Sequence, residues 1–268
     1  MQPRLGLSLW MVELVWDKYC RAHHVPCVTL FYVLVWLKHY PFKTVLPLLG
    51  PQHLKPIGKD AAWRHVRAGL RNLDEVMVEI DEAHFRHKNN SVPHFPFTIG
   101  SWDTFPILVP SGKGRFQPKY KASVVKFQGI TNHLGLFAFI SGPHPGAMSD
   151  TTLARMYRPN LTPTDVILAD LAYLSVPNCS TLFKKANSYD LDRDEMEFNR
   201  VHRFYRARVE HQFGHLHGWK LVSSKYRSPH MGPLKWGVRV LCHLHNMKLG
   251  FRCGYMPYTP IKPTARDG

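Results

Sequence analysis

Cysteine is scarce in this chain of 268 residues, and its five cysteines follow no pattern. Their number is odd, no CxxC pair occurs, and they are scattered: Cys20, Cys27, Cys179, Cys242 and Cys253. A chain of this length can bury a substantial core, so it does not need a disulfide scaffold. The simpler interpretation is buried free thiols in a reducing, intracellular compartment.

Long hydrophobic runs are also missing. The longest apolar segment, Val28 to Leu37, is about half of what a helix needs to cross a bilayer. The opening segment from Leu5 to Trp16 is apolar, but it carries Glu13 and has no small-residue cleavage site. We therefore expect neither a transmembrane span nor a secretory signal.

Acidic residues are few, since 19 Asp and Glu stand against 35 Lys and Arg and the formal net charge is +16. Such a balance predicts a polyanionic partner, because Lys and Arg that neutralise a phosphate backbone gain from the release of counterions. Composition alone leaves open a ribosome-associated or merely basic protein. It excludes no enzyme class by itself.

The first 90 residues are expected to be helical. Apolar spacing predicts one helix from Val28 to His39, a short segment from Phe42 to Leu49 and a long helix from Asp60 onward. The apolar stripe of the long helix is Trp63, Val66, Leu70, Leu73, Val76 and Ile80. Two interpretations stay open for residues 1–90: a helix-turn-helix-like unit that reads DNA, or a helical bundle that covers one face of the core.

Residues 91–255 are expected to form a separate domain that contains a sheet. Short β-type runs at Phe105 to Val109, Ala122 to Phe127 and Leu136 to Ile140 predict an antiparallel meander. Ser149 or Asp150 can cap the helix that follows. A further strand, Val166 to Leu168, leads straight into Asp170.

A long helix is predicted from Asp192 to about Leu216, because Asp192 and Glu195 have the spacing of a capping box. One face of this helix is apolar, and another carries Asn199, Arg203, Arg206 and Glu210. A last helix is predicted from Gly237 to Phe251, before a proline-containing tail at residues 256–268.

Two carboxylates stand alone in basic stretches. Asp103 is the only acidic residue between Glu82 and Asp150, and Glu210 is the only one from Phe198 to Arg266. A surface that binds nucleic acid should exclude carboxylates, so each of these two is expected to have a specific task. Asp170 joins them, because a side chain at the end of an apolar strand is held rigidly at the edge of a sheet.

Three carboxylates from distant elements suit metal-assisted cleavage of phosphodiesters. Carboxylate oxygens are ligands that Mg²⁺ and Mn²⁺ accept, and two such ions can serve the attacking and the leaving oxygen. Each residue also has an ordinary alternative: a turn residue for Asp103, a helix cap for Asp170 and an ion pair with Arg206 for Glu210. The residues alone do not decide between these interpretations.

The sequence segments around these three acids resemble the DDE endonuclease domain of Harbinger-type transposases and related insertion-sequence enzymes. The resemblance covers roughly Ile99 to Phe251 and is carried by an ordered set of motifs: Gly100-Ser101-Trp102-Asp103-Thr104, Ser149-Asp150-Thr151, Ile167 to Tyr173, Phe198 to Gly214 and Leu244-His245-Asn246. The acidic residues follow in the family's order, 67 and 40 residues apart. The chain departs from the family where Ala169 and Ala172 replace glycines that many members have beside the second aspartate.

The resemblance implies an α/β fold with a mixed sheet: an RNase H-like core of about five strands flanked by helices. It implies that Asp103, Asp170 and Glu210 are catalytic and hold one or two Mg²⁺ or Mn²⁺ ions, so that DNA is cut and the freed 3′-hydroxyl attacks target DNA. Arg203, Arg206 and Lys126 are the candidates for DNA contacts, and helix capping is the role expected for Asp150.

The resemblance also implies a separate Myb-like DNA-binding partner, a homo-oligomer, and residence in the nucleus if the source is eukaryotic, otherwise in the cytoplasm.

The sequence leaves two rival functions open. A zinc hydrolase would use Glu210-His211 with His215, but the order of these residues is not that of a His-Glu-x-x-His site. The more serious rival is a domesticated or decayed transposase that keeps the fold and binds DNA or protein without cutting. The three carboxylates are present, which favours the nuclease.

Overall fold

A mixed sheet forms the centre of the computed structural model, which describes residues 5–51, 57–87, 90–185 and 190–252. Its long strands are β1 (Thr98–Leu108), β3 (Ala122–Thr131) and β4 (Phe137–Pro145), joined by the short strands β2 (Phe116–Gln117), β5 (Val166–Ala169) and β6 (Cys179–Ser180). The order is β2-β3-β1-β5-β6, with β4 also paired to β3. β1, β3 and β4 run antiparallel in sequence, whereas β5 and β6 run parallel to β1.

This topology confirms the predicted α/β fold with an RNase H-like mixed sheet. The meander of β1, β3 and β4 and the strand before Asp170 are confirmed, but two strands are longer than their predicted runs: β1 begins at Thr98, well before Phe105, and β4 extends past Ile140 to Pro145. The two-residue strands β2 and β6 are the parts that the apolar pattern did not reveal, because so short a strand has no period.

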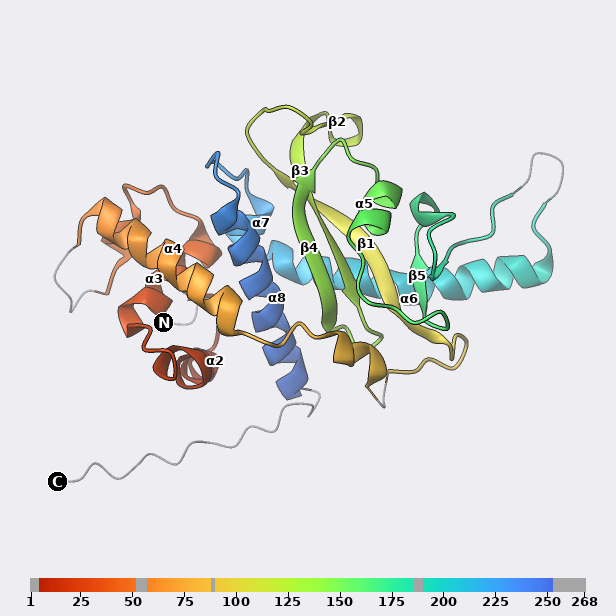
Figure 1. The fold of residues 1–268 in the computed structure, drawn as a ribbon, viewed down its shortest axis with the longest axis horizontal. Coiled ribbons are helices and arrows are strands. Elements are labelled where there is room, and N and C mark those ends of the chain that lie inside the picture. Colours follow the sequence, from red (N-terminus) through yellow and green to blue (C-terminus); the bar gives the residue numbers. More distant parts are fainter. Residues whose placement is uncertain (1–4, 52–56, 88–89, 186–189, 253–268) are drawn as a thin grey trace, which may run out of the picture.

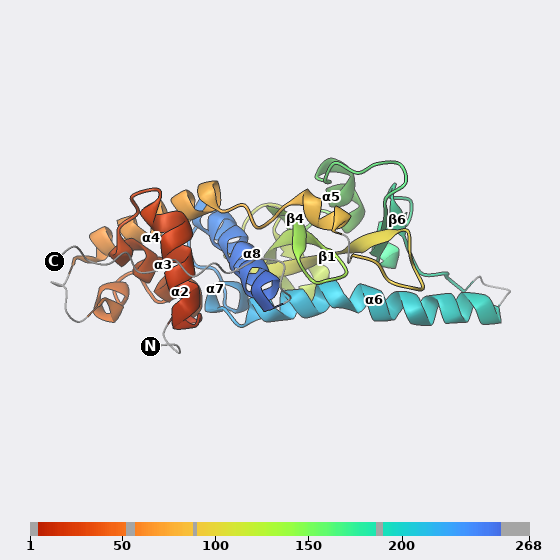
Figure 2. The same cartoon turned by 90° about the horizontal axis from the view of Figure 1, so that it is seen from below.

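Helices cover both faces of the sheet (Figure 1). The view from below shows α6 (Arg193–His217) on one face and α5 (Asp150–Met156) on the opposite one (Figure 2). Side chains alternate along β1: Phe105 and Ile107 pack in the same hydrophobic cluster as Val209 and Phe213 of α6. Trp102 belongs to a second cluster, with Ala154 of α5. From Ser101 onward, the odd-numbered positions of β1 therefore face α6.

The helix α6 begins as predicted. The side chain of Asp192 accepts from the backbone N–H of Glu195, whose carboxylate accepts from the N–H of Asp192 in return. The first turns of α6 project past the edge of the sheet (Figures 1 and 2). The rest of α6 is held on the sheet by its apolar face.

The N-terminal helices lie beside α8 (Gly232–Arg252) at the other end of the molecule (Figure 1). They are α2 (Leu9–Val15), a π-helical turn (Trp16–Arg21), α3 (Cys27–His39) and α4 (Lys59–Val76). A 3₁₀ turn, Leu46–Leu49, lies between α3 and α4, and another, Glu82–Arg86, follows α4. A short helix, α7 (Lys220–Ser223), links α6 to the segment before α8. One hydrophobic cluster continues from these helices into the sheet, because it contains Val33, Leu70, Phe137 and Leu241.

The long N-terminal helix ends earlier than its apolar stripe predicts. The stripe runs to Ile80, but α4 ends at Val76 and Met77 is extended. Hydrogen bonds to α8 replace helical hydrogen bonds in the next residues: Asn246 donates to the backbone oxygen of Glu79, and the N–H of Ile80 donates to His243. Similarly, only Leu46–Leu49 of the predicted segment 42–49 is helical, as a 3₁₀ turn.

No helix within the described ranges has both the length and the apolar character that crossing a membrane would require.

Acid should destabilise the fold through His133, in the turn between β3 and β4. This side chain is buried with Nε2 against the backbone oxygen of Thr98, and burial lowers the pKa of His133 to about 4. An unfolded histidine titrates near 6.5, so between these values the unfolded state binds a proton that the folded state does not. Stability is complete above about pH 6.5 and is lost as pH falls toward 4.

We expect the wild type to lose about 1–2 kcal/mol between pH 7 and pH 5 through this residue, measured by urea unfolding. In His133→Gln this part of the pH dependence should disappear, whereas His23→Gln, at an exposed position, should keep it. Identical pH profiles for wild type and His133→Gln would contradict the assignment.

Candidate active site

Asp103 lies in the middle of β1, on the side that faces α6. Its side chain is 21% exposed, and its Oδ1 accepts from the backbone N–H of Thr104 at 2.7 Å. It pairs with Gly129 of β3 in the antiparallel register, where Phe213 of α6 stands over the glycine. The turn interpretation of Asp103 is therefore wrong, and this carboxylate is held on a central strand.

Asp170 follows β5 directly. β5 runs parallel to β1 with Ala169 opposite Trp102, so Asp170 and Asp103 are the next residues on neighbouring strands. The side chain of Asp170 is the N-cap of a 3₁₀ turn (Leu171–Tyr173) and accepts from the N–H of Leu171 at 2.7 Å. The capping alternative is confirmed, and among the described residues no hydrogen bond occupies Oδ2 of Asp170.

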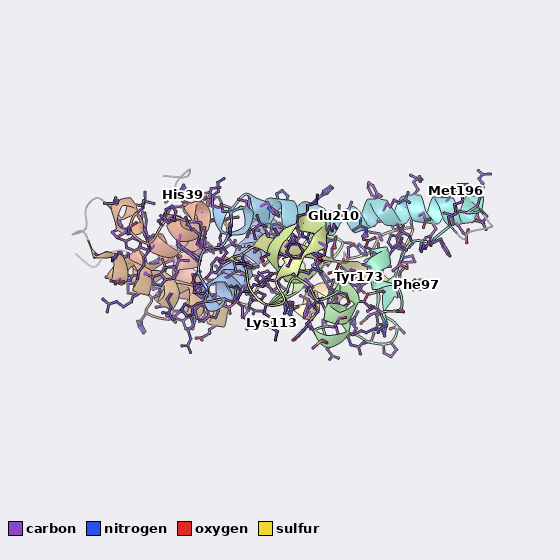
Figure 3. The ribbon with its side chains drawn as sticks, turned by 90° about the horizontal axis from the view of Figure 1, so that it is seen from above. His39, Phe97, Lys113, Tyr173, Met196 and Glu210 are labelled. Atoms are coloured by element: carbon purple, nitrogen blue, oxygen red, sulfur yellow. The ribbon has the colours of Figure 1, made fainter. Side chains whose placement is uncertain are left out.

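Glu210 reaches the same place from α6. Val209 and Phe213 on either side of it anchor the helix on the sheet, and its own carboxylate is 49% exposed. Figure 3 shows Glu210 over the middle of the molecule and Met196 at the projecting end of α6. The helix thus carries Glu210 to the exposed rim of the site.

Arg206 bridges two of the carboxylates. Its Nη1 lies 3.3 Å from Oδ2 of Asp103, and its Nη2 lies 2.6 Å from Oε1 of Glu210. The guanidinium is 17% exposed. The ion pair expected between Arg206 and Glu210 is confirmed, and Asp103 extends it across the gap between helix and sheet.

Electrostatics show that the three acids share one environment. Burial is the main reason why the pKa of Asp103 is raised to about 6. The N–H of Thr104 and the cation of Arg206 act against this rise, and the negative charges of Glu210 and Asp170 add to it. A buried carboxylate beside two others favours a cation in its neighbourhood.

The donor chemistry fits a divalent metal, although the side chains are not arranged around one. Within the described residues, no group of three or more Asp, Glu, His or Cys side chains is placed to hold a metal ion. The positive charge between Asp103 and Glu210 belongs to Arg206, which stands in for a cation. Turning Arg206 away would free hard oxygen ligands of the type that Mg²⁺ and Mn²⁺ prefer.

Lys126 is not free to bind DNA. It lies on β3 but is buried, with its Nζ 2.9 Å from Oδ1 of Asp150 and donating also to the backbone oxygen of Met148. The capping role expected for Asp150 is also wrong, because Ser149 is the N-cap of α5. A buried ammonium needs a negatively charged partner, and Asp150, the first residue of α5, supplies the carboxylate.

Arg203 keeps an exposed side chain on α6. It precedes Glu210 by seven residues, which is about two helical turns and places both on one side of the helix. Of the three residues predicted to contact DNA, Arg203 is therefore exposed, Arg206 bridges acids and Lys126 is buried.

The bridge from Arg206 to Asp103 was the feature that sequence reasoning missed. The four-residue step from Arg206 to Glu210 is a local signal for an ion pair. No comparable signal links Arg206 to Asp103, because that contact depends on how α6 lies on β1.

Comparison with known proteins places the site in a family. The model of the DDE superfamily endonuclease family matches residues 104–246, which is more than half of the chain and includes Asp170 and Glu210. The match begins one residue after Asp103. No curated protein matches the chain, and no solved structure does.

Proposed function

The chain belongs to the DDE superfamily of endonucleases, and from this we propose that it is a transposase-like nuclease that cleaves DNA with divalent metal ions. The observation that carries the proposal is the arrangement of three acids: Asp170 follows β5 next to Asp103 of β1, and Arg206 links Asp103 to Glu210 of α6. The net charge of +16 supports a polyanionic substrate.

The three acids would hold one or two Mg²⁺ or Mn²⁺ ions. When bound, such ions supply activation of a water nucleophile and neutralise charge on the leaving oxygen. Asp103 forms the buried floor of the site, Asp170 is fixed by its cap to Leu171, and Glu210 closes the exposed side. Arg203 is our candidate for a phosphate contact beside the cleavage point.

The proposal includes strand transfer by the same three acids. Cleavage leaves a 3′-hydroxyl, and the acids that serve the first displacement can serve an attack of that hydroxyl on target DNA. The resemblance to Harbinger-type enzymes supports further parts of the proposal: a Myb-like partner for DNA recognition, a homo-oligomer, and residence in the nucleus of a eukaryotic source. The helices of residues 1–90 are proposed as a covering bundle or a DNA-reading unit, and residues 91–255 as the nuclease domain.

A second function is a DNA-binding protein that no longer cuts. One observation favours it: Arg206 occupies the space between Asp103 and Glu210, and no ready metal cluster exists among the described residues. A domesticated transposase would keep such a closed site and its basic surface.

Nicking of supercoiled DNA in Mg²⁺ or Mn²⁺ tests the proposal. We expect Asp170→Asn and Glu210→Gln to lower the nicking rate by at least about a hundredfold. Even substitutions of residues that only hydrogen-bond to a metal ligand typically lower metal affinity or activity by about 10- to 100-fold. Glu197→Gln is the matched control on α6, since Glu197 is exposed and pairs with Arg200. It should nick at the wild-type rate.

Nicking that survives chelation of the metal, or that persists in both acid variants, would contradict the triad. A wild type that is inert with and without a candidate partner protein, but binds DNA with a steep salt dependence, would favour the second function.

A further inference from the structure

Arg206 has a hydrogen-bond donor that its contacts with Asp103 and Glu210 do not use. Two of its nitrogens contact Asp103 and Glu210, while its Nε is buried without a hydrogen-bond partner in the described part of the chain. A buried donor without a partner is a cost that native structures usually avoid. The present position of Arg206 is therefore one that a better acceptor could change.

A metal ion and the guanidinium compete for the same carboxylates. Both are cations, and both would lie between Asp103, which is mostly buried, and Glu210, which is half-exposed. Metal binding must therefore release Arg206 from at least one of its acids, which opposes loading of the free protein. The two ion pairs that Arg206 makes with Asp103 and Glu210 therefore compete with the metal for these carboxylates.

A phosphate group is the acceptor that suits the released side chain. The guanidinium is planar and can donate two parallel hydrogen bonds to phosphate oxygens. Arg206 precedes Glu210 by one helical turn, and the exposed Arg203 lies nearly a turn further along the same helix. DNA that lies along this part of α6 would bring phosphates within reach of both arginines.

We infer that Arg206 couples metal loading to DNA binding: it neutralises Asp103 and Glu210 in the free protein, and a DNA phosphate draws it away so that metal can enter. The inference rests on the proposed function and extends it. It gives the site an order of assembly, since DNA and metal each favour the binding of the other. By linkage, the two effects must be equal in size.

Mn²⁺ binding measured by electron paramagnetic resonance tests the coupling without any cleavage. The titration is done on the full chain alone and with a phosphorothioate duplex, and Mn²⁺ held by the duplex itself is subtracted. Arg206→Gln removes the internal cation and leaves a shorter, neutral amide. Arg200→Gln is the matched control, because Arg200 is exposed on the same helix and pairs with Glu197.

We expect Arg206→Gln to bind Mn²⁺ at least tenfold more tightly than the wild type when DNA is absent. The duplex should tighten Mn²⁺ binding in the wild type and in Arg200→Gln, and should add little in Arg206→Gln. Arg206→Lys should fall between, since an ammonium keeps the charge but cannot bridge both acids in the same way.

Asp103→Asn separates the inference from the function on which it rests. If Asp103→Asn loses Mn²⁺ binding while Arg206→Gln and Arg206→Lys bind it no better than the wild type, the coupling is wrong and the metal site stands. If no Mn²⁺ binding depends on Asp103, with or without DNA, both the coupling and the metal-dependent nuclease are wrong.

Discussion

Asp103→Asn should lower the rate of DNA nicking by at least about a hundredfold. The same substitution should leave the protein at least as stable as the wild type. The activity falls because asparagine is a poorer ligand for a hard cation than a carboxylate. The stability should not fall, because the folded protein disfavours the charge that Asp103 carries. Function and stability therefore make opposite demands on this residue.

The sign follows from the pKa of Asp103, which burial raises to about 6. An unfolded aspartate titrates near 3.9, so between these values the folded state binds a proton that the unfolded state has lost. Wild-type stability therefore falls as pH rises from about 4 to about 6. At pH 7 we expect Asp103→Asn to be more stable by about 1–3 kcal/mol.

Urea unfolding at pH 7, beside the nicking assay, measures both effects. Asp150→Asn is the contrasting variant, because it leaves the ammonium of Lys126, whose side chain is 7% exposed, without its carboxylate. That variant should lose stability. A marked loss of stability in Asp103→Asn as well would mean that Asp103 serves the fold and not the chemistry.

Glu79→Ala is expected to cost the fold about 3 kcal/mol, as removal of one partner of a buried ion pair does. Glu79 lies just after α4 with a side chain that is 0% exposed, 2.9 Å from Nζ of Lys18 and 3.4 Å from Nδ1 of His243. Burial would raise the pKa of Glu79, but the contact with His243 and the ion pair with Lys18 outweigh it and lower that pKa. The carboxylate thus ties the N-terminal helices to α8.

The loss should be measured as a shift in urea unfolding at pH 7. Glu75→Ala is the control on α4, where the exposed pair with Arg71 should contribute at most about 0.5 kcal/mol. Equal effects of the two substitutions would show that the buried network around Glu79 adds nothing to the contact between α4 and α8.

Local patterns were sufficient where a short stretch of chain decides its own structure. The capping box of Asp192 starts α6, and the apolar spacing from Val28 to His39 locates α3 within one residue. The meander of β1, β3 and β4 follows from apolar runs between turn residues. The same patterns failed at the end of α4, where Glu79 and Ile80 exchange helical hydrogen bonds for contacts with α8.

The sequence by itself determined the class of fold, the order of Asp103, Asp170 and Glu210, and the helix on which Glu210 lies. Only the tertiary structure decided that Asp170, at the end of β5, lies next to Asp103 of β1. The same holds for the burial of Lys126 against Asp150 and for the bridge that Arg206 makes from Asp103 to Glu210. The reason is physical: spacing along a chain specifies which residues share a face of a helix or strand. Contacts between faces depend on register and packing, which depend on the whole core.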